Sequence, residues 1–488
     1  YMSIIFLPLD ERFCTKDYFI MLSKSFNLDV LFPDKLGYKK IPADVDYLID
    51  WLMKNTREKD YLLISLDMLL HGGLIPSRLD FLSLETLKNR LGILRRIKNM
   101  NTKIYAVKTL TRIPKYNSDD EEPDYWEFFG EKLYQFSLRI SKGEYNVPID
   151  IPKWIIDDFI ERRKRNLEIT KEIINLVKEG IIDYLEITLD DNSEGSLLYK
   201  ESVELENLAE QMNIRERVSI QNGADEALLT LLSKMITEKF KVRPKFKVIY
   251  SFPESKHLIP PYESFPLYIN IEKHIKNCGG ILSEDHPDII LYVNNFKGDE
   301  KSREAPLQEG HRSEIPYEIL DRINQKEIIG IADVRYANGS DRELLEKLLS
   351  MNINWNNVSY YGWNTPGNTI GSVCAHTTLQ FLANKGYLSI NSEEIKKYQA
   401  TLILEHYGFQ ADIRQKLVRE LEKKLDVRYL RLPYTLIPFE EWAIDFTKKN
   451  LKRYLRKINN SFQENWDIEV FFPWHRTFEI GIRLFKVE

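Results

Sequence analysis

Apolar and polar positions follow two patterns that alternate along most of the chain. Short runs that alternate apolar with polar residues are typical of strands, and stretches with helical spacing separate them. The strand-like runs are residues 3–8, 59–66, 103–107, 184–189, 217–221, 246–250, 289–293, 327–332 and 358–362. The clearest helical stretches are residues 45–54, 84–98, 154–178, 226–239 and 342–350. This alternation predicts an α/β fold with a parallel sheet covered by helices, and we favour a TIM-barrel-like arrangement over a doubly wound open sheet.

The pattern changes near residue 385, where the strand–helix alternation stops. Residues 393–404, 411–424 and 439–455 have helical spacing, and the chain ends in two short apolar runs, 470–474 and 480–485. A chain of 488 residues is also too long for one compact core of ordinary size. We therefore expect an α/β catalytic domain over residues 1–384 and a mostly helical C-terminal region over residues 385–488.

Composition narrows the class of protein. Hydrophobic residues make up 43% of the chain and charged residues 29%, so it can build a large core. The formal net charge of −5 argues against nucleic acid or an anionic membrane as a partner. The three cysteines are too few for a disulfide framework. With no apolar run long enough for a membrane span and no visible signal peptide, a cytoplasmic protein is expected.

Polar residues gather directly after the strand-like runs. In parallel α/β folds, ligands bind at the carboxyl ends of strands, so these residues are the candidates for a binding site. One such residue could be explained by the solubility of its loop, but their repeated occurrence at strand ends points to a shared site. The candidates are Asp10, Arg12, Asp67, Arg78, Arg112, Asp190, Asp191, Asp225, Glu226, Trp363, Asn364 and Asn368.

Asp190 and Asp191 are the most informative pair, because they follow the run 184–189 without a break. Two close carboxyl groups push each other's pKa values apart, which supplies an acid and a base at one place. The alternative is a solvated turn in which an aspartate caps the backbone. The acidic stretch 117–124 is expected to be an exposed loop.

The stretch from Trp363 to Thr369 combines an aromatic ring with neutral amide and hydroxyl groups. This mixture suits a polyhydroxylated or amide-bearing ligand. The alternative is a helix N-terminus at which Thr369 caps a buried helix. Asp341 is likewise expected to cap the helical stretch 342–350, and Asp225 with Glu226 could be a first-turn pair that answers a helix dipole.

Metal and cofactor motifs are absent from the sequence. His71 and His376 do not form a close metal-binding pattern, and no phosphate-binding glycine loop is present. We expect neither a metal nor a cofactor. A metal-dependent hydrolase is an alternative, in which four aspartates surround a hard divalent ion. The four are Asp10, Asp67, Asp190 and Asp225.

Several motifs resemble one known family when they are taken together. The resemblance is to the domain-of-unknown-function family numbered 4127, and it covers nearly the whole chain. That family carries no established activity, so the resemblance implies no particular reaction. The motifs are Pro8-Leu9-Asp10-Glu11-Arg12, Ser65-Leu66-Asp67-Met68-Leu69, Gly72-Gly73-Leu74 with Ser77-Arg78, Asp190-Asp191, Gly223-Ala224-Asp225-Glu226, Ala337-Asn338-Gly339-Ser340-Asp341, Gly362-Trp363-Asn364-Thr365 with Gly367-Asn368-Thr369, and Pro473-Trp474-His475-Arg476-Thr477-Phe478-Glu479.

A local similarity bears on chemistry. A strand that ends in Asp-Asp, with an aromatic-Asn motif downstream, looks like the hexosaminidases of the O-GlcNAcase type. That similarity implies a barrel in which Asp190 steers the 2-acetamido group of the substrate and Asp191 is the general acid/base. Retaining hydrolysis would then proceed through the substrate's own carbonyl.

The leading hypothesis is a glycoside hydrolase that acts on a small carbohydrate, which could be N-acetylated. Asp191 would protonate the leaving oxygen and Asp190 would orient the sugar. Asp67, Asp225 and Asn368 would bind hydroxyl groups, and Trp363 would stack on a ring. A third hypothesis is a non-catalytic sugar-binding protein.

Overall fold

The computed structural model describes residues 3–58, 60–298, 303–309, 314–426 and 435–488. The chain folds into two compact units. Unit 1 contains residues 1–11, 28–232 and 262–265, and unit 2 contains residues 12–27, 233–261 and 266–488. The chain therefore passes between the units several times.

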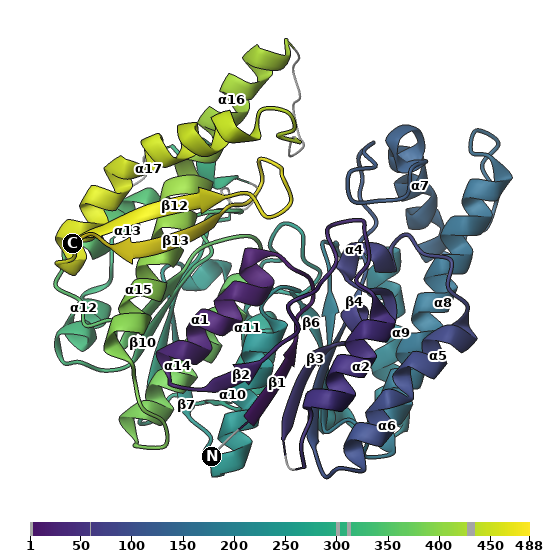
Figure 1. Cartoon of the computed structure of the whole chain (residues 1–488), viewed down its shortest axis with the longest axis horizontal. Coiled ribbons are helices and arrows are strands. Elements are labelled where there is room, and N and C mark those ends of the chain that lie inside the picture. The colour runs from purple at the N-terminus through teal and green to yellow at the C-terminus, as the bar shows by residue number, and fades with distance from the viewer. Residues whose placement is uncertain (1–2, 59, 299–302, 310–313, 427–434) are drawn as a thin grey trace. The chain divides into compact units, whose positions relative to one another are not determined.

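Unit 1 is built on a six-stranded sheet with the order β2-β1-β3-β4-β5-β6, in which every pairing is parallel. Parallel strands need crossover connections. The connection from β1 to β2 runs through residues 12–27 of unit 2, and the helices of unit 1 supply the others (Figure 1). The strands are β1 (Ser3–Leu7), β2 (Asp29–Leu31), β3 (Tyr61–Ser65), β4 (Lys103–Leu110), β5 (Tyr184–Leu189) and β6 (Val218–Asn222). The helices are α2 (Val45–Asn55), α3 (Leu66–His71), α4 (Leu74–Ser77), α5 (Leu84–Leu91), α6 (Ile93–Lys98), α7 (Trp126–Ser141), α8 (Lys153–Lys178), α9 (Leu197–Gln211) and the 3-10 turn η2 (Arg215–Arg217).

The central strands of unit 1 are buried in its core. All six residues of β5 are buried, as expected for a strand with neighbours on both edges and side chains packed on both faces. Apolar residues of α2, α5, α6, α8 and α9 pack with the strands in one cluster. The predicted helical stretch 84–98 is interrupted at Gly92, which separates α5 from α6.

Unit 2 is built on a five-stranded parallel sheet with the order β11-β10-β9-β7-β8. Its strands are β7 (Lys245–Tyr250), β8 (Ile281–Leu282), β9 (Ile289–Asn294), β10 (Ile329–Asp333) and β11 (Val358–Tyr361). When the strands of this sheet are numbered in sequence from β7, their order across the sheet is 2-1-3-4-5. Strands β2-β1-β3-β4-β5 of unit 1 have the same order. That order is the flavodoxin-like order of doubly wound sheets, so the topology occurs twice in the chain.

The helices of unit 2 include two π-helical segments, η1 and η5. The helical elements are η1 (Phe13–Asp17), α1 (Tyr18–Ser25), η3 (Pro253–Ser255), α11 (Leu267–Asn277), η4 (Ala305–Leu307), α12 (Tyr317–Asn324), α13 (Arg342–Leu349), α14 (Pro366–Asn384), α15 (Ser392–Ile403), η5 (Leu404–Ile413), α16 (Arg414–Leu425) and α17 (Glu440–Phe462). Helix α10 (Ala227–Phe240) spans the boundary between the units. The chain ends in an antiparallel hairpin of β12 (Trp466–Phe471) and β13 (Gly481–Lys486), drawn in yellow in Figure 1.

Gly330 in β10 allows helix α14 to pack closely on the sheet of unit 2. A Cβ atom at Gly330 in β10 would lie 2.4 Å from Val373 and 2.7 Å from Thr377, both in α14. Only glycine leaves room for that helix to pack directly on the strand. Helix α14 is buried from Pro366 to Leu382.

The predicted fold class is confirmed: the strands form parallel sheets covered by helices, and the C-terminal region is largely helical. Two sheets replace the single sheet that was expected. Among the described residues, each of the two parallel sheets has two edge strands, and no pairing between edge strands supports the TIM-barrel-like arrangement. The division into units does not fall at residue 385, and the proposed domain boundary there stays a prediction. Within the described ranges, no helix has both the length and the apolar character needed to cross a bilayer.

Candidate functional site

The candidate site in unit 1 is centred on Asp190, which follows β5 directly. Its Oδ2 atom accepts a hydrogen bond from Arg78 Nη2 at 2.6 Å and one from the backbone N–H of Arg112 at 3.4 Å. Its Oδ1 atom accepts from the backbone N–H of Asp191 at 3.0 Å. One guanidinium and two peptide groups are donors that suit a carboxylate. Asp190 is thus held in one orientation at the end of the strand.

Asp191 has a different environment, although it is the next residue. Its Oδ2 atom lies 3.5 Å from Arg112 Nη1, and 41% of its side chain is exposed. Partial burial of the carboxyl group and the neighbouring charge of Asp190 raise the pKa of Asp191 to about 7, while Arg112 and Arg78 oppose the rise. Because solvent reaches this side chain, the effect of the neighbouring charges on it should weaken with salt.

Two glutamates that the sequence analysis missed complete the cluster. Glu122 Oε1 accepts from Arg78 Nη1 at 3.2 Å and from Arg112 Nε at 3.0 Å, so it bridges the two arginines. Glu121 Oε2 accepts from Arg112 Nη2 at 3.0 Å. The expectation that residues 117–124 form an exposed loop is wrong for Glu122, which is buried. The two guanidinium groups offset the cost of taking its charge out of water.

Side-chain amides fix the loop after the two aspartates. Asn192 Nδ2 donates to the carbonyl oxygen of Asp190 at 2.6 Å and to Asn222 Oδ1 at 3.1 Å. Asn222 is the last residue of β6, and its Oδ1 atom also accepts from the backbone N–H and the hydroxyl of Ser264. The loop is therefore tied to the neighbouring strand, which limits the movement of Asp190 and Asp191.

Asp67 forms a separate buried ion pair. Its Oδ1 atom accepts from Lys108 Nζ at 2.7 Å and its Oδ2 atom from the backbone N–H of Thr109 at 2.9 Å. Lys108 also donates to the carbonyl oxygen of Thr109. Both charged side chains are almost inaccessible. In this structure both oxygens of Asp67 are used to join α3 to β4.

Three other candidates in unit 1 also lie at strand ends. Asp10 is buried three residues beyond β1. Glu226 is buried before α10, and its Oε2 atom accepts from the backbone N–H of Ala224 at 2.9 Å. This contact folds the glutamate back over Gly223, whose φ of +142° favours glycine. Asp225, which directly precedes Glu226, is half-buried.

The remaining candidates belong to unit 2, and two of them contact aromatic groups. Arg12 Cζ lies 4.7 Å from the centre of the Trp474 ring. Trp363 is buried and stacks on His406, with 6.1 Å between ring centres. The structure places Asn364 in the left-handed region (φ 60°), while Asn368 Nδ2 donates to Thr365 Oγ1 at 3.1 Å inside the first turn of α14.

The helix that follows Trp363 begins before Thr369, the residue that was expected to cap it. Helix α14 begins at Pro366, so Thr369 lies within it, and the Thr369 hydroxyl donates to the carbonyl oxygen of Trp363 at 2.8 Å. The loops after β5 and after β11 occupy equivalent places in the two sheets. The Asp-Asp motif and the Gly-Trp-Asn motif are thus topological counterparts.

Unit 2 contains a second acidic cluster, in which the buried carboxyl groups of Asp333 and Asp341 bond to neighbouring groups of the same unit. Asp333 accepts from Asn294 Nδ2 at 3.0 Å, from the backbone N–H of Asp341 at 2.7 Å and from the Tyr360 hydroxyl at 2.6 Å. Asp341 precedes α13 but makes no side-chain cap, and its carboxylate instead contacts Arg335 Nη1 at 3.0 Å. Burial and the charge of Asp341 raise the pKa of Asp333 to about 7.

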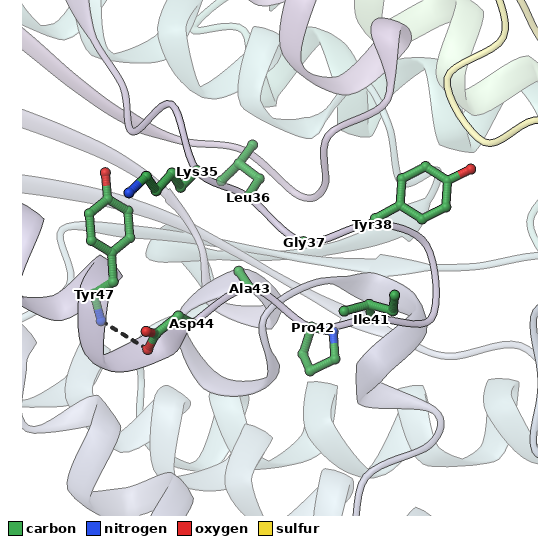
Figure 2. Close-up of a pocket in the computed structure, with 9 residues that line it drawn as sticks. All are labelled: Lys35, Leu36, Gly37, Tyr38, Ile41, Pro42, Ala43, Asp44 and Tyr47. Carbon is green, nitrogen blue, oxygen red and sulfur yellow. Dashed lines mark hydrogen bonds between the residues drawn. The ribbon is translucent and has the colours of Figure 1, made fainter.

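A small surface pocket in unit 1 has a different lining. Its cavity of about 310 Å³ is bounded by the loop before α2 and by the first turn of that helix (Figure 2). Asp44 Oδ1 caps the helix by accepting from the backbone N–H of Tyr47 at 3.2 Å. The same loop is tied to the acidic segment, because Lys39 Nζ donates to Asp120 at 2.5 Å. The lining residues are Lys35, Leu36, Gly37, Tyr38, Ile41, Pro42, Ala43, Asp44 and Tyr47.

Metal binding has no matching ligand cluster in the described part of the chain. There, no three His, Cys, Asp or Glu side chains are grouped so that they could hold an ion. In particular, the paired oxygens of Asp67 are already used by Lys108 and Thr109.

Comparison with known proteins identifies the family. A search of curated proteins gives no match. A family model described as "Protein of unknown function (DUF4127)" matches residues 4–483. Since that match spans almost the entire sequence, the chain belongs to the DUF4127 family.

Proposed function

We propose that the protein is a hydrolase that uses Asp190 and Asp191 for general acid–base catalysis, with glycosides as its substrates. The observation that carries the proposal is the contrast between the two carboxyl groups. Asp190 is fixed by Arg78 and two backbone N–H groups, whereas Asp191 is partly exposed and has a pKa raised to about 7. A group that titrates near neutral pH is suited to giving and taking a proton at that pH.

In the proposed reaction, Asp191 donates its proton to the oxygen of the leaving group as the glycosidic C–O bond breaks. A water molecule then adds to the anomeric carbon and returns a proton to Asp191. The carboxylate of Asp190 faces the positive charge that develops on the sugar ring, or orients a polar group of the sugar. Arg78 and Arg112 act as positioning residues, because they hold both aspartates and the two glutamates.

The three buried cysteines support a reducing compartment for this chemistry. Cys14, Cys278 and Cys374 are buried and form no disulfide bond. Disulfides are rare in the cytoplasm, and we propose that the enzyme acts there.

The decisive experiment is a screen of aryl glycosides, with N-acetylhexosaminides included, against the purified chain. A substrate that is turned over should be hydrolysed far more slowly by Asp191→Asn. The matched control is Glu194→Gln, because Glu194 is an exposed acid in the same loop and should be dispensable. Turnover that is equal in Asp191→Asn and the wild type would remove Asp191 from the reaction.

The same screen separates the other two hypotheses. Saturable sugar binding without turnover of any glycoside would support a non-catalytic binding protein. Activity that is lost on treatment with a chelator and restored by a divalent ion would support a metal-dependent hydrolase. Activity that survives the chelator would favour the acid–base mechanism.

A further inference from the structure

A second group of titratable side chains lies inside unit 2 and has no part in the proposed function. Tyr18 of α1 and two consecutive residues of η5, Glu405 and His406, meet there and are buried. The Tyr18 hydroxyl lies 2.5 Å from Glu405 Oε2 and 2.8 Å from His406 Nε2. Tyr18 directly follows the π-helical segment η1, and both partners belong to the other one. π-Helical segments are rare and occur frequently at functional sites.

Two sequence motifs hold His406 in place. The backbone N–H of Gly362 donates to His406 Nδ1 at 3.1 Å, and the ring of Trp363 stacks on the imidazole. The backbone N–H of Ser340 donates to the His406 carbonyl oxygen at 3.1 Å. The loops that contain Gly362 and Ser340 are therefore packed against η5.

The hydrogen bonds determine where the protons of this group lie. Because His406 Nδ1 accepts a hydrogen bond, the neutral ring carries its proton on Nε2 and donates it to the Tyr18 oxygen. Burial lowers the pKa of His406 to about 3, which keeps the ring neutral. Tyr18 then donates its own proton to Glu405 Oε2. A neutral Glu405 must therefore hold its proton on Oε1.

The Oε1 atom of Glu405 is buried and makes no hydrogen bond to any described residue. The titratable groups that face this carboxyl group are Tyr18 from α1, Tyr398 from α15, His406 from η5 and Glu479 from the loop before β13. Glu479 is itself paired with Arg476 at 2.7 Å and 2.8 Å. In the described part of the chain, no lysine or arginine forms an ion pair with Glu405. An ionised Glu405 would thus be a buried charge with a single hydrogen-bond donor. The hydrogen bond from Tyr18 strengthens when Glu405 ionises, but the free-energy cost of keeping the charge out of water is larger and opposes the packing of α1 on η5.

We propose that Tyr18, His406 and Glu405 form a pH-sensitive lock that holds α1 against η5 while Glu405 is protonated and loosens when Glu405 loses its proton. Burial and the charge of Glu479 raise the pKa of Glu405 to about 8, which puts this change close to physiological pH. Residues 12–27 are an excursion of the chain into unit 2 between two strands of unit 1. The lock controls how firmly this excursion is attached to unit 2.

Hydrogen exchange of the full chain, followed by mass spectrometry from pH 6 to pH 9 and corrected for intrinsic rates, tests the lock. Wild-type peptides from α1 and η5 should gain exchange as Glu405 ionises. Glu405→Gln keeps an oxygen for Tyr18 but cannot ionise, and it should remove this gain. Glu441→Gln is the matched control, because Glu441 is exposed on α17 and should leave the gain unchanged. An equal gain in Glu405→Gln and the wild type, or no gain in the wild type, would overturn the proposal.

Tyr18→Phe provides a second variant if Glu405→Gln does not fold. The Tyr18 hydroxyl stabilises the ionised carboxylate, so its loss should raise the pKa of Glu405 further. The transition in exchange should then move to a higher pH. A transition at the wild-type pH in Tyr18→Phe would contradict the lock.

Discussion

Arg78 Nη2 lies 2.6 Å from Asp190 Oδ2, and the two residues are separated by more than a hundred positions in sequence. The contact joins the end of α4 to the end of β5. It leaves the adjacent Asp191 as the more exposed of the two aspartates, with 41% of its side chain accessible against 11% for Asp190. One carboxyl group is thereby fixed and its neighbour is available to exchange protons.

Asp191→Asn should lower turnover of a glycoside substrate by about 10²–10⁴-fold, because general acid–base catalysis typically contributes that much. The asparagine keeps the size and polarity of the side chain, so the fold should be unchanged. Steady-state kinetics on the substrate found in the glycoside screen measures the effect, and circular dichroism checks the fold. A loss below about tenfold would speak against a proton-transfer role.

The pH dependence of the same reaction should report Asp191. The reaction needs the protonated carboxyl group, so activity should fall as the pH rises through about 7. Arg112 lowers the pKa of Asp191, so Arg112→Gln should move this fall to higher pH, whereas Arg112→Lys keeps the charge and should move it less. The measurement is kcat/KM from pH 5 to pH 9 at fixed ionic strength. A profile that is identical in all three proteins would exclude Asp191 as the titrating acid.

Asp67→Ala should destabilise unit 1 by about 3–5 kcal/mol, because it leaves Lys108 buried without its carboxylate partner. Replacing both residues, as in Asp67→Ala with Lys108→Met, should recover part of this loss. Denaturation by urea measures the free energy of unfolding of the single and double variants. If Asp67 instead binds a sugar hydroxyl, the single variant would lose activity while its stability stayed close to that of the wild type.

Stability should fall in acid because of buried neutral histidines. Burial lowers the pKa of His376 to about 3, so the folded chain binds fewer protons than the unfolded chain between about pH 3 and pH 6.5. The stability that this histidine contributes is complete above its unfolded pKa and is lost as the pH falls toward 3. His376→Gln should reduce the slope of unfolding free energy against pH in this window. His257→Gln, at an exposed position, should leave the slope unchanged.

Local sequence pattern predicted much of the fold because its signals act over a few residues. The position of strand β5 follows from the alternating run 184–189, and the position of Asp190 and Asp191 follows from the end of that run. The burial of Glu186 and Thr188 within β5 does not follow from the run, because it depends on hydrogen bonds to other strands and to α10. The strands and helices of both units were largely located by the same means. Pattern could not assign the strands to two sheets, because β-strand pairing depends on contacts between residues far apart in sequence.

The sequence by itself determined that a strand ends in two carboxyl groups and that other polar residues follow other strands. Only the tertiary structure decided which of these groups meet. Glu122 resembles any residue of an acidic loop until Arg78 and Arg112 offset the free-energy cost of its burial. Glu405 and His406 carry no local signal, and their character depends on Tyr18, which is more than 380 positions away. The physical reason is that desolvation and charge pairing set the chemistry of a side chain, and both depend on neighbours that only folding supplies.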